Sequence, residues 1–116
     1  MKTCVYDMRT STGETLNLSL SMSRQYRAKE KYPEAYAACG KVIMGGLDDY
    51  MQIADVLYFA YICAAMDNPD NKVMDYSEFL DCIPDDVNYV NSLYLRITGR
   101  KKTEPSRNAS NSGQEN

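Results

Sequence analysis

The stretch from Ile53 to Met66 reads IADVLYFAYICAAM and is the most apolar segment of the chain. Asp55 is its only charged residue, and its alanines favour a helix over a strand. A helix that is apolar on nearly every side lies at the centre of a fold, with neighbours on both sides. The segment is shorter than the roughly 20 apolar residues that a membrane helix needs. We therefore expect a buried central helix and no membrane association.

Two segments near the N-terminus alternate with the two-residue period of a β-strand. The residues that share one face are Cys4, Tyr6 and Met8 in the first segment, and Leu16, Leu18 and Leu20 in the second. The polar connection RTSTG ends in a glycine, which tolerates a positive φ and suits a hairpin loop. Because a lone hairpin is marginally stable in water, we expect its leucine face to rest on helices.

Two helices are predicted between the hairpin and the central helix. The first begins at Ser21 or Ser23, either of which can cap it, and ends at about Lys31. Pro33 bars its continuation and suits the first turn of the second helix. That helix ends at a Gly-Gly pair, after which Asp48 or Asp49 opens the central helix. Its predicted core positions are Ala35, Ala38, Cys39, Val42 and Ile43.

Two more helices are predicted after the central one. Asp75 begins a short helix over 76–82, which Pro84 ends. Asp85 or Asp86 then starts the last helix, and a glycine at position 99 suits its C-terminus. Its predicted core positions are Val87, Val90, Leu93, Tyr94 and Ile97. The fold class is therefore α+β, a hairpin followed by a bundle of about five helices.

The domain organisation follows from length and composition. With 116 residues, of which 44% are hydrophobic and 25% charged, the chain suits one globular domain. We assign residues 1–99 to that domain. Residues 100–116 read RKKTEPSRNASNSGQEN and cannot bury enough apolar surface to repay ordering. We expect them to form a disordered polar tail.

Composition and charge exclude several classes of function. The chain has no histidine, so neither histidine-based catalysis nor histidine metal ligation is available. Its four cysteines are widely separated, which favours buried free thiols over a zinc site. Residues 34–95 hold eleven acidic residues against two lysines, a net charge of −9, so a nucleic-acid partner is not expected. No cofactor and no enzymatic activity are predicted, and the acidic body suits a basic or mixed protein partner.

The sharpest local motif resembles an EF-hand calcium loop between Asp67 and Glu78. Asp67, Asn71, Asp75 and Glu78 fall on ligand positions 1, 5, 9 and 12. A proline occupies position 3, and a lysine replaces the glycine at position 6. A capping box of Asp75 and Glu78 explains the same residues more simply. A degenerate calcium-binding protein therefore stays only as an alternative.

The partner-binding residues predicted from sequence are Tyr26, Arg27, Tyr32 and Tyr36, which belong to or flank a short basic segment. Tyrosine offers a large contact area and a polar tip at low entropic cost, so it is common at interfaces. Ordinary packing of amphipathic helices is the competing explanation for these tyrosines.

The order of segments resembles a known family. A hairpin (TCVYDM and ETLNLSL) precedes a charged helix that ends in Lys-Tyr-Pro, and an amphipathic helix precedes DVLYFAYICAAM and DYSEFLDCIP. Over about residues 2–99 this pattern resembles the tail assembly chaperones of bacteriophages with long, flexible, non-contractile tails. The resemblance rests on the order and length of the segments and not on an invariant motif.

The resemblance implies a non-catalytic function in the cytoplasm of the bacterial host. Such chaperones bind the helical tape measure protein, keep it soluble, promote assembly of the tail tube protein, and are absent from the mature virion. Many also exist as a longer form produced by ribosomal frameshifting, for which codons at Lys101-Lys102 are a candidate position. The alternative is a small phage or bacterial adaptor, or a structural tail protein.

Overall fold

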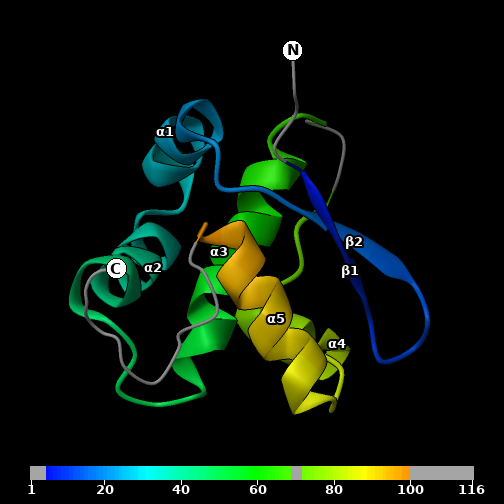
Figure 1. The fold of residues 1–116 in the computed structure, drawn as a ribbon. Helices are drawn as coiled ribbons and strands as arrows, with labels where there is room; N and C mark the ends of the chain where they lie inside the picture. The colour runs from blue at the N-terminus through cyan, green and yellow to red at the C-terminus, as the bar shows by residue number, and fades with distance from the viewer. Residues whose placement is uncertain (1–4, 69–71, 100–116) are drawn as a thin grey trace.

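The computed structural model describes residues 5–68 and 72–99. Within these residues an antiparallel hairpin precedes five helices, so the fold is α+β, as predicted (Figure 1). The elements are β1 (Tyr6–Arg9), β2 (Thr15–Leu18), α1 (Met22–Lys31), α2 (Pro33–Gly45), α3 (Gln52–Ala65), α4 (Tyr76–Cys82) and α5 (Val87–Ile97). The tail predicted over 100–116 lies outside the described residues, as does Cys4.

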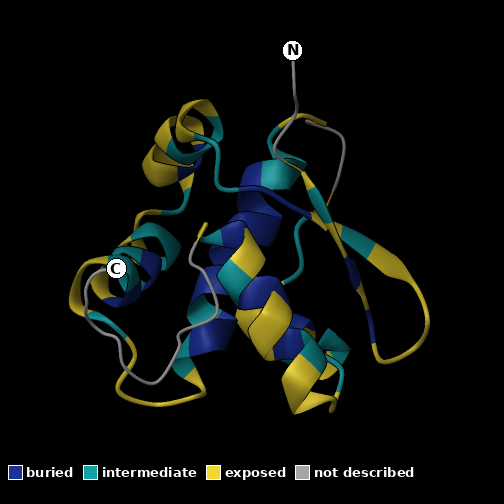
Figure 2. Cartoon of the chain, viewed as in Figure 1, coloured by how far each residue is buried: buried dark blue, intermediate teal, exposed yellow. Residues whose placement is uncertain are grey.

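Helix α3 is the centre of the fold, as its apolar sequence predicts. It contacts α1 and α2 on one side and β2 on another, and α4 and α5 also pack on it (Figure 1). Most of its length is buried, whereas the outer faces of the surrounding helices are exposed (Figure 2). All seven elements contribute to one hydrophobic cluster with α3 at its middle.

The hairpin forms as predicted, and its pairing brings the two predicted faces, those of Tyr6 and Met8 and of Leu16 and Leu18, to the same side of the sheet. Tyr6 lies opposite Leu18 and Met8 opposite Leu16, and the Met8 and Leu18 side chains are fully buried. The backbone N–H of Ser19 donates a 3.0 Å hydrogen bond to the carbonyl of Ala60 in α3. This bond and the buried face hold the two-stranded sheet against the helices.

The ends of α4 and α5 follow the capping signals in the sequence. Asp75 and Glu78 form the predicted capping box, in which the Asp75 carboxylate accepts from the N–H of Glu78 at 2.8 Å. The Asp86 carboxylate caps α5 by accepting from the N–H of Tyr89. Gly99 has a φ of 73°, a left-handed conformation that suits glycine after a helix.

Two predicted caps are wrong in detail. Ser21 is the N-cap residue of α1, but its hydroxyl makes no capping bond and instead accepts a hydrogen bond from the Arg24 guanidinium. The N-cap of α3 is Met51 and not an aspartate. The Asp49 carboxylate accepts from the N–H of Met51 in the preceding turn, so it organises the approach to the helix.

The predicted core of α5 is correct except at its first position. Val90, Leu93, Tyr94 and Ile97 are buried, but the side chain of Val87 is 55% exposed. Val87 satisfies the helical period, yet it is the first residue of α5, where the neighbouring helices cover it only in part. Among the cysteines, Cys39 and Cys63 are buried free thiols, as predicted, while Cys82 is half-buried. Burial raises the pKa of both buried thiols to about 12.

Candidate functional site

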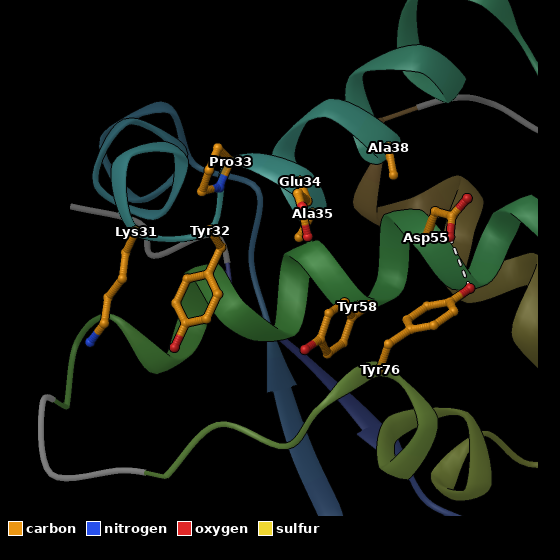
Figure 3. A pocket seen from close by; sticks show the side chains of 9 residues that line it. All are labelled: Lys31, Tyr32, Pro33, Glu34, Ala35, Ala38, Asp55, Tyr58 and Tyr76. Carbon is orange, nitrogen blue, oxygen red and sulfur yellow. Dashed lines mark hydrogen bonds between the residues drawn. The ribbon is translucent and has the colours of Figure 1, made fainter.

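Residues of four helices line a pocket of about 440 Å³ that we call the tyrosine pocket (Figure 3). Its aromatic and charged lining residues are Lys31, Tyr32, Glu34, Asp55, Tyr58 and Tyr76. The junction of α1 and α2 supplies the first three, α3 the next two, and the start of α4 the last. Pro33 at that junction ends α1 and begins α2, and α2 forms one wall of the pocket.

The ring of Tyr58 is held in place by two neighbouring aromatic rings and by one hydrogen bond. Tyr58 lies between Tyr32 and Tyr76 in the view of Figure 3. Its ring meets that of Tyr76 edge-on, at 5.3 Å between centroids, and lies 5.3 Å from the buried ring of Phe79. The Tyr58 hydroxyl donates a 2.8 Å hydrogen bond to the carbonyl of Met74. These contacts leave the tyrosine little freedom, so the pocket has a preformed floor.

Asp55 is the distinctive polar group of this pocket. It is half-buried, and its Oδ1 accepts a 2.8 Å hydrogen bond from the Tyr76 hydroxyl. Burial, followed by the hydrogen bond to Asp55 and its negative charge, raises the pKa of Tyr76 to about 12, so the phenol stays protonated at neutral pH. Within the described part of the chain, no lysine or arginine forms an ion pair with this carboxylate.

A second hollow of about 230 Å³ lies where α3, α4 and α5 meet, and we call it the apolar groove. Its apolar lining residues include Tyr50, Met51, Ile53, Leu80, Ile83 and Val87. The side chains of Met51 and Val87 are 57% and 55% exposed, so the groove opens onto an uncovered apolar surface. Leu47, in the connection between α2 and α3, is also exposed. Exposed apolar surface of this kind marks interaction sites.

Four aspartates lie close in sequence to residues of the apolar groove, and one of them, Asp85, lines it. Asp48 and Asp49 precede α3, while Asp85 and Asp86 precede α5, and all four are exposed. Asp49 and Asp86 each accept one backbone hydrogen bond, which fixes their carboxylates close to the chain turns. The apolar groove thus has negatively charged side chains beside it, which we call the acidic rim.

The two hollows share the same pair of helices. On α3 the residues Met51, Asp55 and Tyr58 have the spacing of one helical face, with Met51 at the apolar groove and the other two at the tyrosine pocket. On α4, Tyr76 lines the tyrosine pocket, and Leu80, one turn later, lines the apolar groove. The hollows therefore follow one another along the seam between α3 and α4.

The four residues predicted from sequence do not form one site with these hollows. Tyr32 lines the tyrosine pocket, and Tyr36 packs edge-on against Phe59 at 5.7 Å. Tyr26 is 68% exposed on α1. The Arg27 guanidinium lies 3.4 Å from the carboxylate of Asp67, an exposed ion pair. Neither Tyr26 nor Arg27 lines the two hollows, and their role in partner contact stays a prediction.

The EF-hand alternative meets competing interactions at three of its four ligands. Asp67 is bound by Arg24 at 2.7 Å and by Arg27, and these two guanidinium groups hold the pKa of its carboxyl below the usual value. Asp75 and Glu78 are engaged in the capping box. Asn71 lies outside the described residues. Within the described ranges, no group of three or more cysteine and carboxylate side chains is arranged to hold a metal ion.

The sequence marks one of the residues that line the hollows, but it does not indicate which residues come together there. Asp55 is the single charge in an apolar helix, and a charge there needs either solvent or a partner. Tyr76 and Met51 carry no such mark, because each is one of many tyrosines or methionines in the chain. Val87 was assigned to the core, although it is exposed at the groove.

The fold and its hollows define a small α+β protein with two hollows that share residues of α3 and α4 in their linings. No protein family, no curated protein and no solved structure matches this chain. None of the helices in the described part of the chain combines the length and the apolar character needed to cross a bilayer.

Proposed function

We propose that this protein is a tail assembly chaperone of a bacteriophage with a long, non-contractile tail. It binds the tape measure protein, keeps that protein soluble and promotes assembly of the tail tube, without catalysis. Its action takes place in the cytoplasm of the bacterial host, and it does not remain in the mature virion. The tail tube protein and a longer, frameshifted form of the chaperone itself are further partners in this proposal.

The apolar groove is the observation that carries the proposal. A tape measure protein is long, helical and apolar, so a chaperone for it needs an open surface that accepts apolar side chains of a helix. Methionine suits such a surface because its unbranched side chain adapts to different partners. An amphipathic helix laid into an apolar groove is a recurring mode of peptide recognition. The groove between α3, α4 and α5 offers this chemistry on a body that is otherwise acidic.

The experiment is co-expression with the tape measure protein encoded downstream in the same phage, followed by pull-down and a solubility assay. We expect the wild-type chain to bring the tape measure protein into the soluble fraction as a complex. The double variant Met51→Ser, Val87→Ser should lose most of this activity, because it removes both exposed apolar side chains of the groove. Serine suits both positions, since one is an N-cap and the other the first residue of a helix.

Met22→Ser is the matched control. Met22 is 79% exposed at the start of α1 and does not line the groove, so this change removes a methionine of the same kind from another surface. If the control and the double variant solubilise the tape measure protein equally, the groove is not the binding surface. If the wild-type chain forms no complex and leaves the tape measure protein insoluble, the chaperone proposal fails, and an adaptor or structural tail protein becomes the better hypothesis.

A further inference from the structure

We propose that the tyrosine pocket receives a lysine or arginine side chain of the partner helix, one turn away from an apolar side chain that enters the apolar groove. The inference rests on the proposed function and narrows it, because it states the pattern of residues that the bound segment must carry. The occupant is a basic side chain of a polypeptide.

The first argument is the state of the Asp55 carboxylate. It is half-buried, which weakens its hydration, and its described interaction is one hydrogen bond from the Tyr76 hydroxyl to Oδ1. An acidic group removed from water is stabilised by a cation that approaches it, and hydrogen bonds between charged groups are the strong ones. Asp55 has no such cation in an ion pair among the described residues, and it is one of the residues that line the tyrosine pocket.

The second argument is the aromatic lining. Three tyrosine rings line the same pocket as Asp55, and the faces of such rings attract ammonium and guanidinium groups. The chain itself uses this attraction at the rim, where the Lys31 ammonium lies 5.9 Å from the centre of the Tyr32 ring. Glu34 adds a second carboxylate to the lining, so the two acidic groups outnumber the single lysine. The pocket thus favours a positively charged group that is either a flat guanidinium or an ammonium on an apolar side chain.

The third argument is the spacing of the hollows. Met51, the N-cap of α3, and Asp55 are four residues apart, and at about 1.5 Å per residue this separation is about 6 Å. Residues four apart on a partner helix that follows the seam are separated by the same distance. One apolar and one basic side chain on the same face of that helix therefore reach the groove and the pocket together. The acidic rim steers such a helix toward the seam.

The test has two parts, and the first uses the intact protein without its partner. The probe is N-acetyl-arginine amide, titrated against ¹⁵N-labelled protein, with N-acetyl-leucine amide as the neutral control. We expect saturable shifts of the Asp55, Tyr58 and Tyr76 amide signals with the arginine compound only. Asp55→Asn, which keeps the size of the side chain and an oxygen for the Tyr76 hydroxyl, should abolish these shifts. Equal shifts with both compounds, or none with either, would overturn the inference.

The second part measures affinity for the co-expressed tape measure protein. We expect Asp55→Asn to weaken the complex about 10-fold or more, because it removes a charge-assisted hydrogen bond. Asp7→Asn is the control for net charge, since Asp7 is exposed on the hairpin, which lines neither hollow. Equal affinities of the two variants would refute the basic anchor while leaving the chaperone proposal intact. Failure of the wild-type chain to bind, with the arginine titration still positive, would instead refute the proposed partner.

Discussion

Two valines of α5 provide a stringent test of the fold, because the same substitution should have very different effects three residues apart. Val90 is 2% exposed, whereas Val87 is 55% exposed. Val90→Ala removes two buried carbons at about 0.8 kcal/mol each, and the cavity that remains adds to this cost. The better helix propensity of alanine offsets a few tenths of a kcal/mol. We expect a net loss of about 2 kcal/mol for Val90→Ala and a change within about 0.5 kcal/mol for Val87→Ala.

Urea denaturation followed by circular dichroism measures this difference directly. With a slope of about 1–3 kcal/mol per molar urea, the midpoint of Val90→Ala should fall by roughly 1 M relative to the wild-type protein. The midpoint of Val87→Ala should stay nearly unchanged, and its slope should match. If the two variants unfold at the same urea concentration, the assignment of the buried face of α5 is wrong, and with it the exposure of Val87 at the apolar groove.

Four further predictions concern stability. Asp75→Ala removes the capping box of α4 and should cost about 0.5–2 kcal/mol in urea denaturation, while Asp75→Asn, which keeps an acceptor, should cost less. The Tyr94 hydroxyl is buried without a hydrogen-bond partner among the described residues, so Tyr94→Phe should leave the melting temperature unchanged or raise it, and a clear fall would show a missed partner. Because the pKa values of Cys39 and Cys63 are raised from 9.0 to about 12, the folded state holds these protons more tightly than the unfolded state. The contribution of the two protonated thiols to the free energy of unfolding is therefore complete below pH 9 and is lost as the pH rises toward 12. Between these pH values the melting temperature of the wild-type protein should fall more than that of a variant with both cysteines changed to alanine. Asp67→Asn should cost less than about 1 kcal/mol and progressively less with added salt, since its arginine pairs are exposed; a salt-independent cost would mean that the pairs are not the cause.

The local structure was largely determined by the sequence, because its signals act over a few residues. The two-residue alternation in the hairpin and the apolar run of α3 depend only on the neighbours along the chain. Asp75 with Glu78, Asp86 and Gly99 mark helix ends through bonds within one turn, and all are found where they were predicted. The class of the fold follows from these elements, since a hairpin with one apolar face needs helices to cover it.

Interactions between distant segments were decided only by the tertiary structure. The period of α5 assigned Val87 to the core, but whether a helical position is buried depends on where the neighbouring helices end. The ion pair of Asp67 with Arg24 joins residues 43 positions apart, and no local rule predicts it.

The candidate site shows the same division. The sequence indicated that Asp55 is unusual, because a single carboxylate in an apolar helix is costly unless something compensates it. It could not indicate that Tyr32, from the junction of α1 and α2, and Tyr76, from α4, line the same pocket as that carboxylate, because their placement depends on how α2 and α4 pack against α3. Amino-acid patterns fix what each segment can bury, whereas the packing of the segments fixes which side chains remain at the surface together.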